Sequence, residues 1–418
     1  YMDSSPVVFI TGNVGENLIG KDSFQEVDIT GISMPITKCN YLVRRAEDLA
    51  DVIREAFAIA RSGRPGPVLI DILKNVTYDE ADYEFLPRSE HGKHGRLAAM
   101  LRRASHDLKT PEPDHSDIDK LLGMIEEAEK PLVLVGGGVI RSKGAVPEFR
   151  RFFERLNAPV ASTIMGGGDC PGSHPLFTGM IGMHGSHASN HAVSECDLLI
   201  VIGCRFSDRV ATDPKSFASQ ARIVQIDIDR AEIGKNVSPD ISMWGDVKMI
   251  LQRILDVLPQ CEHPDWLRQI EEYKSAEVLP PAKGFSPRAI IEEVNRRGDA
   301  DTVVATDVGQ HQMWTMQFYK FEKPQRLLTS GGLGTMGYGL GAAIGGCIAN
   351  GRKRTVLFTG DGSFGMNLNE MATAVSQNLP LTIVVMNNDV LGMVRQWQTI
   401  FYDCHYSHTT LDRRTDFP

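Results

Sequence analysis

The sequence has little that would mark a secreted, membrane-bound or nucleic-acid-binding protein. Its seven cysteines are scattered without a Cys-x-x-Cys pair, so we expect reduced thiols rather than a disulfide or zinc framework. No apolar run reaches membrane-spanning length. A net charge of -9, with no block of like charge, argues against a nucleic-acid partner. We therefore expect neither a membrane nor a nucleic-acid partner, and a cytoplasmic location in a bacterium or a plastid or mitochondrial matrix in a eukaryote.

The composition, by contrast, is that of a large globular protein. The chain has 418 residues, of which 42% are hydrophobic and 23% charged, which allows two to four domains. Two polar, proline-rich stretches at 78–116 and 259–287 are predicted to be links. They separate three blocks, 1–77, 117–258 and 288–418. Because the chain starts directly before an apolar run and stops shortly after its last motif, we expect a fragment truncated at both ends.

Apolar runs alternate with helical patterns in every block, which indicates an α/β fold with parallel sheets. We expect three successive doubly wound parallel-sheet domains, of which the first and the last are incomplete. The expected strands are 7–11, 67–71, 132–135, 198–202, 223–228, 302–306, 355–359 and 381–386, and the clearest helices are 46–62 and 367–377.

The most informative motif lies near the C-terminus. Gly360-Asp361-Gly362-Ser363 follows one expected strand, and Asn387-Asn388 follows the next. Strand ends of a parallel sheet meet at one edge, so Asp361 and Asn388 are expected to be neighbours there. A carboxylate and an amide oxygen suit Mg²⁺ that carries phosphate oxygens. Two unrelated tight turns are the alternative, but the residue types and both strand ends agree on a metal-diphosphate site.

This spacing resembles the thiamine diphosphate motif, and further segments extend the resemblance along essentially the whole chain. The chain resembles the large catalytic subunit of acetohydroxyacid (acetolactate) synthase. The segments that carry this resemblance are Phe24-Gln-Glu26, Gly63-Arg-Pro-Gly-Pro-Val68, Gly182-Met-His-Gly185, Arg205-Phe-Ser-Asp-Arg-Val210, Gly309-Gln-His-Gln-Met-Trp314, Gly332-Leu-Gly-Thr-Met-Gly-Tyr-Gly339 and Gly392-Met-Val-Arg-Gln-Trp-Gln398. The resemblance implies a pyrimidine-binding domain at 1–77, an FAD-binding domain at 117–258 and a diphosphate- and magnesium-binding domain at 288–418.

The resemblance assigns cofactor residues in the last block. Asp361, Asn388 and the carbonyl of Val390 are implied as the Mg²⁺ ligands, and Met336 as the hydrophobic support that bends thiamine diphosphate, which a proton transfer within the cofactor requires. The implied thiamine diphosphate contacts are Val308, Gly309, Gln310, His311, Met336, Gly362, Ser363, Gly392 and Met393.

In the middle block, the glycine triplet Gly136–Gly138 after an expected strand leaves two interpretations open, a nucleotide site or a structural turn. The resemblance implies FAD, although family members that bind FAD usually have a second aspartate where this chain has Ser207. The implied FAD contacts are Arg64, Gly136, Gly137, Gly138, Thr163, Ile164, Gly182, Met183, His184, Gly203, Arg205, Asp208, Arg209, Asp227, Ile228, Glu232, Gly245 and Asp246.

For the substrates, pyruvate and a second 2-keto acid, the resemblance implies contacts at Phe24, Lys74, Met393, Arg395 and Trp397, and a catalytic role for Gln25. Trp397 is implied in the preference for 2-ketobutyrate. Leu73 and Asn75 depart from the usual Pro-Lys-Asp context of Lys74, so the mouth of the substrate channel is expected to differ.

The implied reaction is that of acetolactate synthase, a transferase in branched-chain amino-acid biosynthesis. Thiamine diphosphate decarboxylates pyruvate, and the hydroxyethyl carbanion is ligated to pyruvate or 2-ketobutyrate. Nothing in the chain matches the catalytic glutamate, which we expect upstream of Tyr1, so the fragment is predicted to be inactive. A homodimer or homotetramer and a small regulatory subunit are the implied partners. The alternatives are an FAD-free catabolic acetolactate synthase or another thiamine diphosphate carboligase, and a noncatalytic regulatory homologue.

Overall fold

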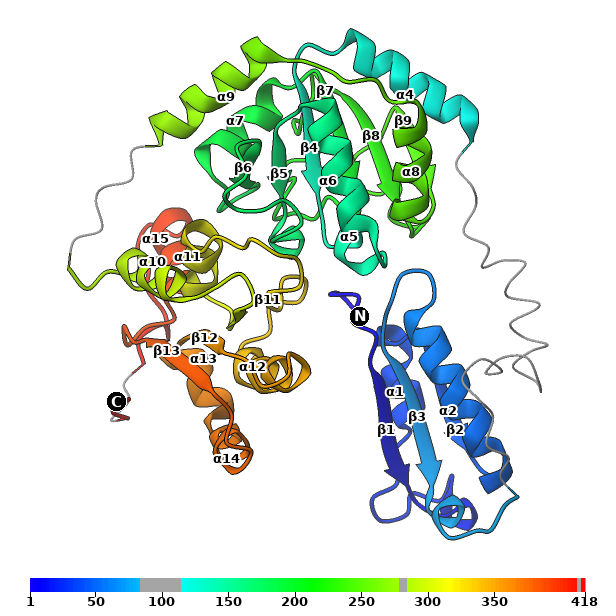
Figure 1. Cartoon of the computed structure of the whole chain (residues 1–418). Helices are drawn as coiled ribbons and strands as arrows, with labels where there is room; N and C mark the ends of the chain where they lie inside the picture. Colours follow the sequence, from blue (N-terminus) through cyan, green and yellow to red (C-terminus); the bar gives the residue numbers. More distant parts are fainter. Residues whose placement is uncertain (83–113, 278–283, 412–414, 418) are drawn as a thin grey trace. The chain divides into compact units, whose positions relative to one another are not determined.

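A computed structural model describes residues 1–82, 114–277, 284–411 and 415–417. The chain divides into two compact units, Tyr1–Pro111 and Glu112–Pro418, which are described separately (Figure 1). Most of the predicted first link lies outside the described residues. Among the helices of the described ranges, none combines the length and apolar character needed to cross a membrane.

The first unit is a three-stranded parallel sheet in the order β1-β3-β2. The amphipathic helix α2 packs Ala56 and Ala60 against it, which confirms the strands and the helix that the sequence predicts here, with ends shifted by a residue or two. The elements are β1 (Val8–Asn13), η1 (Glu16–Leu18), α1 (Ile29–Ser33), η2 (Met34–Ile36), β2 (Cys39–Val43), α2 (Ala46–Arg61), β3 (Val68–Leu73) and η3 (Lys74–Thr77).

A six-stranded parallel sheet forms the first half of the second unit. Its order, β6-β5-β4-β7-β8-β9, runs outward in both directions from the middle. This is the 3-2-1-4-5-6 order of dinucleotide-binding folds. The strands are β4 (Pro131–Val135), β5 (Val160–Ser162), β6 (Phe177–Met180), β7 (Leu198–Ile202), β8 (Arg222–Asp227) and β9 (Ile241–Trp244).

Helices cover both faces of this sheet because alternate strand residues point to opposite sides. Val133 and Val135 face the core formed with α4, α6 and α8, whereas Leu132 and Leu134 face α7 and α9. The predicted doubly wound arrangement is therefore confirmed. The helices are α4 (His115–Glu127), α5 (Gly138–Arg141), α6 (Ala145–Leu156), η4 (Ile164–Gly166), α7 (His187–Glu195), α8 (Val247–Val257) and α9 (Pro264–Ala276).

Helix α9 falls within the stretch that the sequence predicts as the second link. Trp266 is 2% exposed, and its indole nitrogen donates to the carbonyl of Pro131, 2.9 Å away. The prolines that suggested a link lie at the first turn of the helix and beyond its end, because proline is tolerated at those positions. Much of this stretch is thus a packed helix of the central layer rather than a connector.

The second half of this unit is a parallel sheet in the order β11-β10-β12-β13. Helices α10 and α11 cover one face and α12 and α14 the other. The elements are α10 (Pro287–Arg297), β10 (Val303–Thr306), α11 (Gln310–Phe318), β11 (Leu327–Leu328), α12 (Tyr338–Ala349), β12 (Thr355–Gly360), α13 (Asp361–Asn367), η5 (Leu368–Glu370), α14 (Met371–Ser376), β13 (Leu381–Met386) and α15 (Gly392–Phe401).

The connection between β12 and β13 differs from the single helix predicted over 367–377. The helix begins at Asp361, directly after the strand, and a 3-10 turn at Leu368–Glu370 separates α13 from α14. The prediction missed the first part because Gly362 and Gly365, both poor helix formers, lie inside α13. Asp361 therefore lies in the first turn of a helix.

Two loops join the sheets of the second unit. Gly172 donates its amide to the carbonyl of Phe321 at 2.9 Å, and the Ser173 hydroxyl donates to the Glu322 carboxylate at 2.7 Å. Arg150 on α6 donates to the carbonyls of Gly168 and Asp169 on one loop and, at 3.5 Å, of Glu322 on the other. Hydrogen bonds from both main-chain and side-chain groups thus hold the two sheets together.

Candidate cofactor and substrate site

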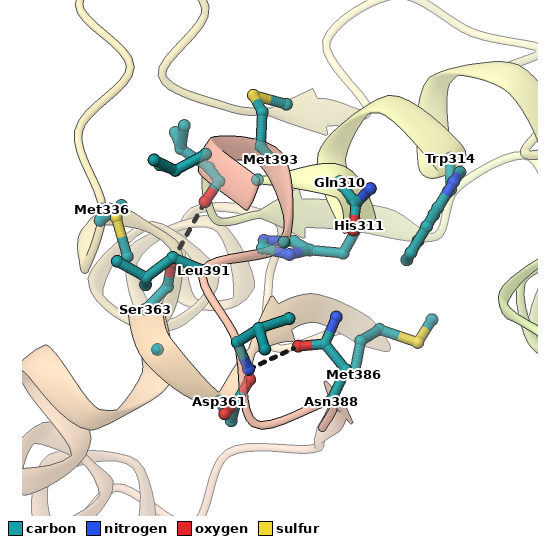
Figure 2. A pocket seen from close by; sticks show the side chains of 17 residues that line it. Gln310, His311, Trp314, Met336, Asp361, Ser363, Met386, Asn388, Leu391 and Met393 are labelled. Carbon is teal, nitrogen blue, oxygen red and sulfur yellow. Dashed lines mark hydrogen bonds between the residues drawn. The ribbon is translucent and has the colours of Figure 1, made fainter. Parts of the chain in front are cut away.

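A pocket of about 460 Å³, including its open mouth, lies at the carboxyl edge of the C-terminal sheet. The order β11-β10-β12-β13 reverses its direction of winding between β10 and β12, which is where ligands bind in open α/β sheets. The pocket forms at this point (Figure 2). The residues that line it are Val308, Gly309, Gln310, His311, Trp314, Met336, Gly360, Asp361, Gly362, Ser363, Met386, Asn388, Val390, Leu391, Gly392, Met393 and Val394.

The two metal ligands predicted from the C-terminal motif, Asp361 and Asn388, both line this pocket. Asp361 follows β12 and is 2% exposed, and Asn388 follows β13, the neighbouring strand. The amide oxygen of Asn388 accepts from the amide of Val390 at 3.2 Å, which fixes the side chain against its own loop. Figure 2 shows both residues on the same side of the pocket. Their proximity was expected from the strand order alone.

His311 occupies the centre of the pocket and is 5% exposed. Burial lowers its pKa to about 4, and a hydrogen bond with the main chain of Asp307 acts in the opposite direction, so the imidazole is neutral near pH 7. The ring lies close to the main chain of Gly309 and Gly360, where a Cβ atom would come within 2.8 Å and 3.1 Å of it. Its buried Nε2 atom has no hydrogen-bond partner within the described residues.

Gln310 connects the pocket to helix α15. Its side-chain amide donates to the side-chain oxygen of Gln396 at 3.2 Å, and its own oxygen lies where a Cβ atom on Gly392 would be, 2.2 Å from that position. The start of α11 is therefore in direct contact with α15.

The apolar part of the pocket comes partly from residues that the sequence did not single out. Met336 lies before α12, and Figure 2 shows it and Trp314 on opposite sides of His311. Trp314 is three residues beyond His311 on α11, so helical periodicity could have identified it. Met386, Leu391 and Val394 flank predicted residues, and no sequence signal separated them from core positions.

A second set of predicted residues gathers at the carboxyl edge of the central sheet. Its winding reverses between β4 and β7, where the loops at Gly136–Gly138 and Gly203 cross. The amide of Gly138 donates to the carbonyl of Gly203 at 3.0 Å. Gly203 has φ +61°, and a Cβ atom there would lie 2.6 Å from the Cα of Gly138. Both interpretations of the glycine triplet thus have support: it makes a close crossing, and it lies at the dinucleotide position.

The other residues predicted to bind FAD lie around the same edge. Thr163 and Ile164 follow β5, and Gly245 and Asp246 follow β9. Asp227 is the last residue of β8, and Ile228 follows it. The carboxylate of Asp246 caps α8 by accepting from the amides of Lys248 and Met249. Asp246 thus also has a structural function.

The loop from Gly182 to His184 is fixed to the segment that contains Arg205, Ser207, Asp208 and Arg209. The carbonyl of Arg209 accepts from the amide of Met183 at 3.1 Å. Ser207 stands where family members that bind FAD usually have a second aspartate. Its carbonyl accepts from the amides of Val210 and Ala211, which closes the turn. The main chain therefore holds this turn with serine in the place of aspartate.

Two family models match the chain. The thiamine pyrophosphate enzyme central domain matches residues 118–254, and the C-terminal TPP binding domain of these enzymes matches 307–418. A probable acetolactate synthase large subunit of Methanocaldococcus jannaschii is 44% identical over 100% of this chain and 71% of its own length. The chain belongs to the acetolactate synthase large-subunit family.

Bacterial and plant relatives agree with this assignment. The acetolactate synthase isozyme 1 large subunit of Escherichia coli is 42% identical over 96% of this chain and 69% of its own length. The chloroplastic acetolactate synthase of Arabidopsis thaliana is 42% identical over 98% of this chain and 60% of its own length. The family assignment and the α/β fold predicted from the sequence are confirmed.

The predicted substrate residues of α15 divide into two groups. Met393 lines the pocket. Arg395 and Trp397 lie further along the helix, where the Arg395 guanidinium stacks on Tyr406, 4.0 Å from the ring centre. The indole of Trp397 lies beneath Arg209, 5.5 Å from the guanidinium carbon. A residue predicted to bind FAD is therefore in contact with one predicted to choose the substrate.

Four predicted residues belong to the first unit. Phe24 is 88% exposed, Gln25 adopts a left-handed conformation with φ 65°, and Lys74 begins the 3-10 turn after β3. The guanidinium of Arg64 donates to the Ser4 hydroxyl at 2.9 Å. Their roles remain predictions.

Proposed function

We propose that the protein catalyses the acetolactate synthase reaction, in which pyruvate is decarboxylated and joined to a second molecule of pyruvate or to 2-ketobutyrate. The observation that carries the proposal is the pocket at the sheet edge, where Asp361, Asn388 and the unpartnered Nε2 of His311 come together. The family assignment is consistent with it.

The donor set fits Mg²⁺. The carboxylate of Asp361, the amide oxygen of Asn388 and the carbonyl of Val390 are oxygen ligands of the kind that Mg²⁺ prefers. Among the described residues, however, no group of three or more His, Cys, Asp or Glu residues could hold a metal ion. We infer that the phosphate oxygens of the cofactor complete the coordination, so that metal and cofactor strengthen each other's binding.

The remaining pocket residues fit thiamine diphosphate. Helix α11 has no side-chain cap at Gly309, so its first amides are open to a phosphate. A ligand atom that bonds the Nε2 of His311 would satisfy a buried polar atom. Met336 offers an apolar support and Trp314 an apolar wall. When bound, thiamine diphosphate supplies the electron sink for decarboxylation of a 2-keto acid.

We also propose that FAD binds at the crossing of the Gly136–Gly138 and Gly203 loops. The support is the strand order, because dinucleotides bind where the winding of such a sheet reverses, and the glycines of both loops, which carry no side chains at that point. Asp227, which is 6% exposed, ends β8 at the same edge. The reaction transfers no net electrons, so we assign the flavin a structural role.

The activity test uses the full-length protein that contains this chain, with pyruvate, thiamine diphosphate and Mg²⁺, and acetolactate as the product measured. Asp361→Asn and Asn388→Ala are expected to weaken Mg²⁺-dependent binding of thiamine diphosphate by at least about tenfold, because each removes a hard oxygen ligand or its charge. Binding is followed by titration, so the result does not depend on turnover.

Asp389→Asn is the matched control for these variants. It removes the same charge one residue from Asn388, its side chain is exposed, and asparagine tolerates the φ of 57° found there. Its cofactor affinity should equal that of the unaltered protein. An unchanged affinity in Asp361→Asn would refute the metal assignment.

The relatives named as large subunits lead us to propose a small regulatory subunit as a partner, and we retain the predicted homodimer or homotetramer. Co-purification with a small subunit and a mass measurement in solution test both. Because the relatives include bacterial and chloroplastic proteins, we propose a bacterial cytoplasm or a plastid as the compartment.

A further inference from the structure

The side chain of Asp307 has no role in the site described so far, although it is one of the most buried carboxylates among the described residues at 1% exposed. One of its oxygens accepts from the amides of Gly337 and Gly339 at 2.8 and 3.1 Å. The other accepts from the hydroxyl of Thr359 at 3.0 Å. A buried carboxylate is tolerated when such donors replace its water.

The carboxylate serves as a remote cap for helix α12. The residue in the N-cap position, Gly337, has φ +85° and offers no side chain to the first amides of the helix. Asp307 approaches from β10 and supplies the acceptor, and its negative charge also lies favourably at a helix N-terminus. On the opposite side, the Asn367 amide donates to the carbonyl of Gly337 at 2.6 Å. Gly337 is thus held through both its amide and its carbonyl.

Each segment that the Asp307 carboxylate joins continues directly into the pocket. Gly337 follows Met336, and Thr359 precedes Gly360 and Asp361. Asp307 itself precedes Val308 at the end of β10, where its amide donates to the carbonyl of Phe358. One buried side chain therefore fixes the spacing between the apolar support and the metal-binding strand end.

We propose that Asp307 is a positioning residue that holds Met336 and Asp361 at the separation that thiamine diphosphate requires. This inference rests on the proposed function of the pocket. The side chain of Asp307 is not among the residues that line the pocket; it acts through the main chain of Gly337 and Gly339 and through the hydroxyl of Thr359.

The direct test is Asp307→Asn, which keeps the size of the side chain but replaces an acceptor with a donor. Amide hydrogen exchange of the ligand-free protein should become at least about tenfold faster at residues 335–340, because the capped amides lose a charged acceptor. Thiamine diphosphate should bind about tenfold more weakly in the presence of Mg²⁺. Asp197→Asn is the control, because Asp197 accepts from the amides of Glu129 and Lys130 in the central layer. This variant should leave both the amide exchange rate at residues 335–340 and the affinity for thiamine diphosphate unchanged.

A milder pair of variants covers the case in which Asp307→Asn does not fold. Thr359→Val removes one donor to the carboxylate, and Thr359→Ser retains it. The valine variant should show faster exchange at 335–340 and weaker cofactor binding, and the serine variant should restore both. If unaltered protein binds thiamine diphosphate but Asp307→Asn or Thr359→Val binds it equally well, the positioning role is refuted. If the unaltered protein does not bind the cofactor, the proposed function fails first.

Discussion

His311 shows at the residue scale how burial prepares a group for a ligand. The ring packs against the main chain of Gly309 and Gly360, its pKa is lowered to about 4 by burial, and its Nε2 atom has no partner within the described residues. A neutral ring is less costly to bury than a charged one. The sequence identified His311 by its motif, but neither its neutrality nor its lack of a partner could be inferred without the packing around it.

The lowered pKa leads to a prediction about stability. The unfolded chain has the ordinary histidine value of 6.5, so it takes up a proton at a pH where the folded protein does not. The contribution of the neutral His311 ring to the free energy of unfolding is therefore fully present above pH 6.5. It is lost as the pH falls from 6.5 toward 4, and the free energy of unfolding decreases by up to about 3 kcal/mol. Denaturant titrations across this range should show a weaker pH dependence for His311→Gln than for the unaltered protein. His405→Gln, at an exposed position, should retain the full dependence, and equal slopes for all three would contradict the argument.

At the scale of elements, α15 connects the pocket of the C-terminal sheet with the central layer. Its first turn touches α11 through Gln310 and Gln396, and its middle places Trp397 under Arg209 of the central layer. The sequence predicts that Trp397 lies near Asn388, the proposed metal ligand, because both follow β13. The contact between Trp397 and Arg209 depends on how the two sheets pack, so it could not be predicted from local sequence patterns.

We expect Trp397→Leu to reduce the preference for 2-ketobutyrate over pyruvate by about tenfold, because a shape-matched apolar wall discriminates one methylene by that order. The ratio of 2-aceto-2-hydroxybutyrate to acetolactate in mixed-substrate assays measures this. Phe401→Leu changes the aromatic neighbour of Trp397, at a ring-centre distance of 4.9 Å, and should leave the ratio unchanged. An unaltered ratio in Trp397→Leu would exclude this role.

The same scale shows where sequence patterns were insufficient. Buried strands such as β7 and β12 were found because short apolar runs without polar interruption have few other structures available. Helix α13 was missed because its glycines are poor helix formers, and α9 was taken for a link because prolines flank it. In both cases tertiary packing prevailed over local preference.

At the scale of the whole molecule, the central sheet is expected to carry the flavin. Gly203→Ala should abolish flavin binding. The new Cβ atom would lie 2.6 Å from the Cα of Gly138, which forces the two loops apart where they cross. Absorbance in the flavin bands of the purified protein provides the measurement. Gly144→Ala imposes a similar left-handed strain, with φ +79°, but meets only the end of Lys248 at 3.4 Å, so it should remain yellow. Flavin that persists in Gly203→Ala would rule out this position.

Most of the architecture could be predicted, and part of the site could not. Alternating apolar runs and helical patterns specify parallel sheets, and parallel sheets specify which loops meet at an edge, so Asp361 and Asn388 were expected to be neighbours. The role of Asp307 could not be foreseen, because its partners lie 30 and 52 positions away along the chain. An aspartate after a strand is too common to single out.

The contacts between the two sheets of the second unit bear on how this protein can be divided. A gene segment that encodes the central sheet alone would leave the amide of Gly172 without the carbonyl of Phe321, and Arg150 without that of Glu322. The converse cut would deprive the C-terminal sheet of the same bonds. Attempts to transplant the central sheet into another protein should therefore include residues 319–324, because hydrogen bonds cross the boundary between the two sheets.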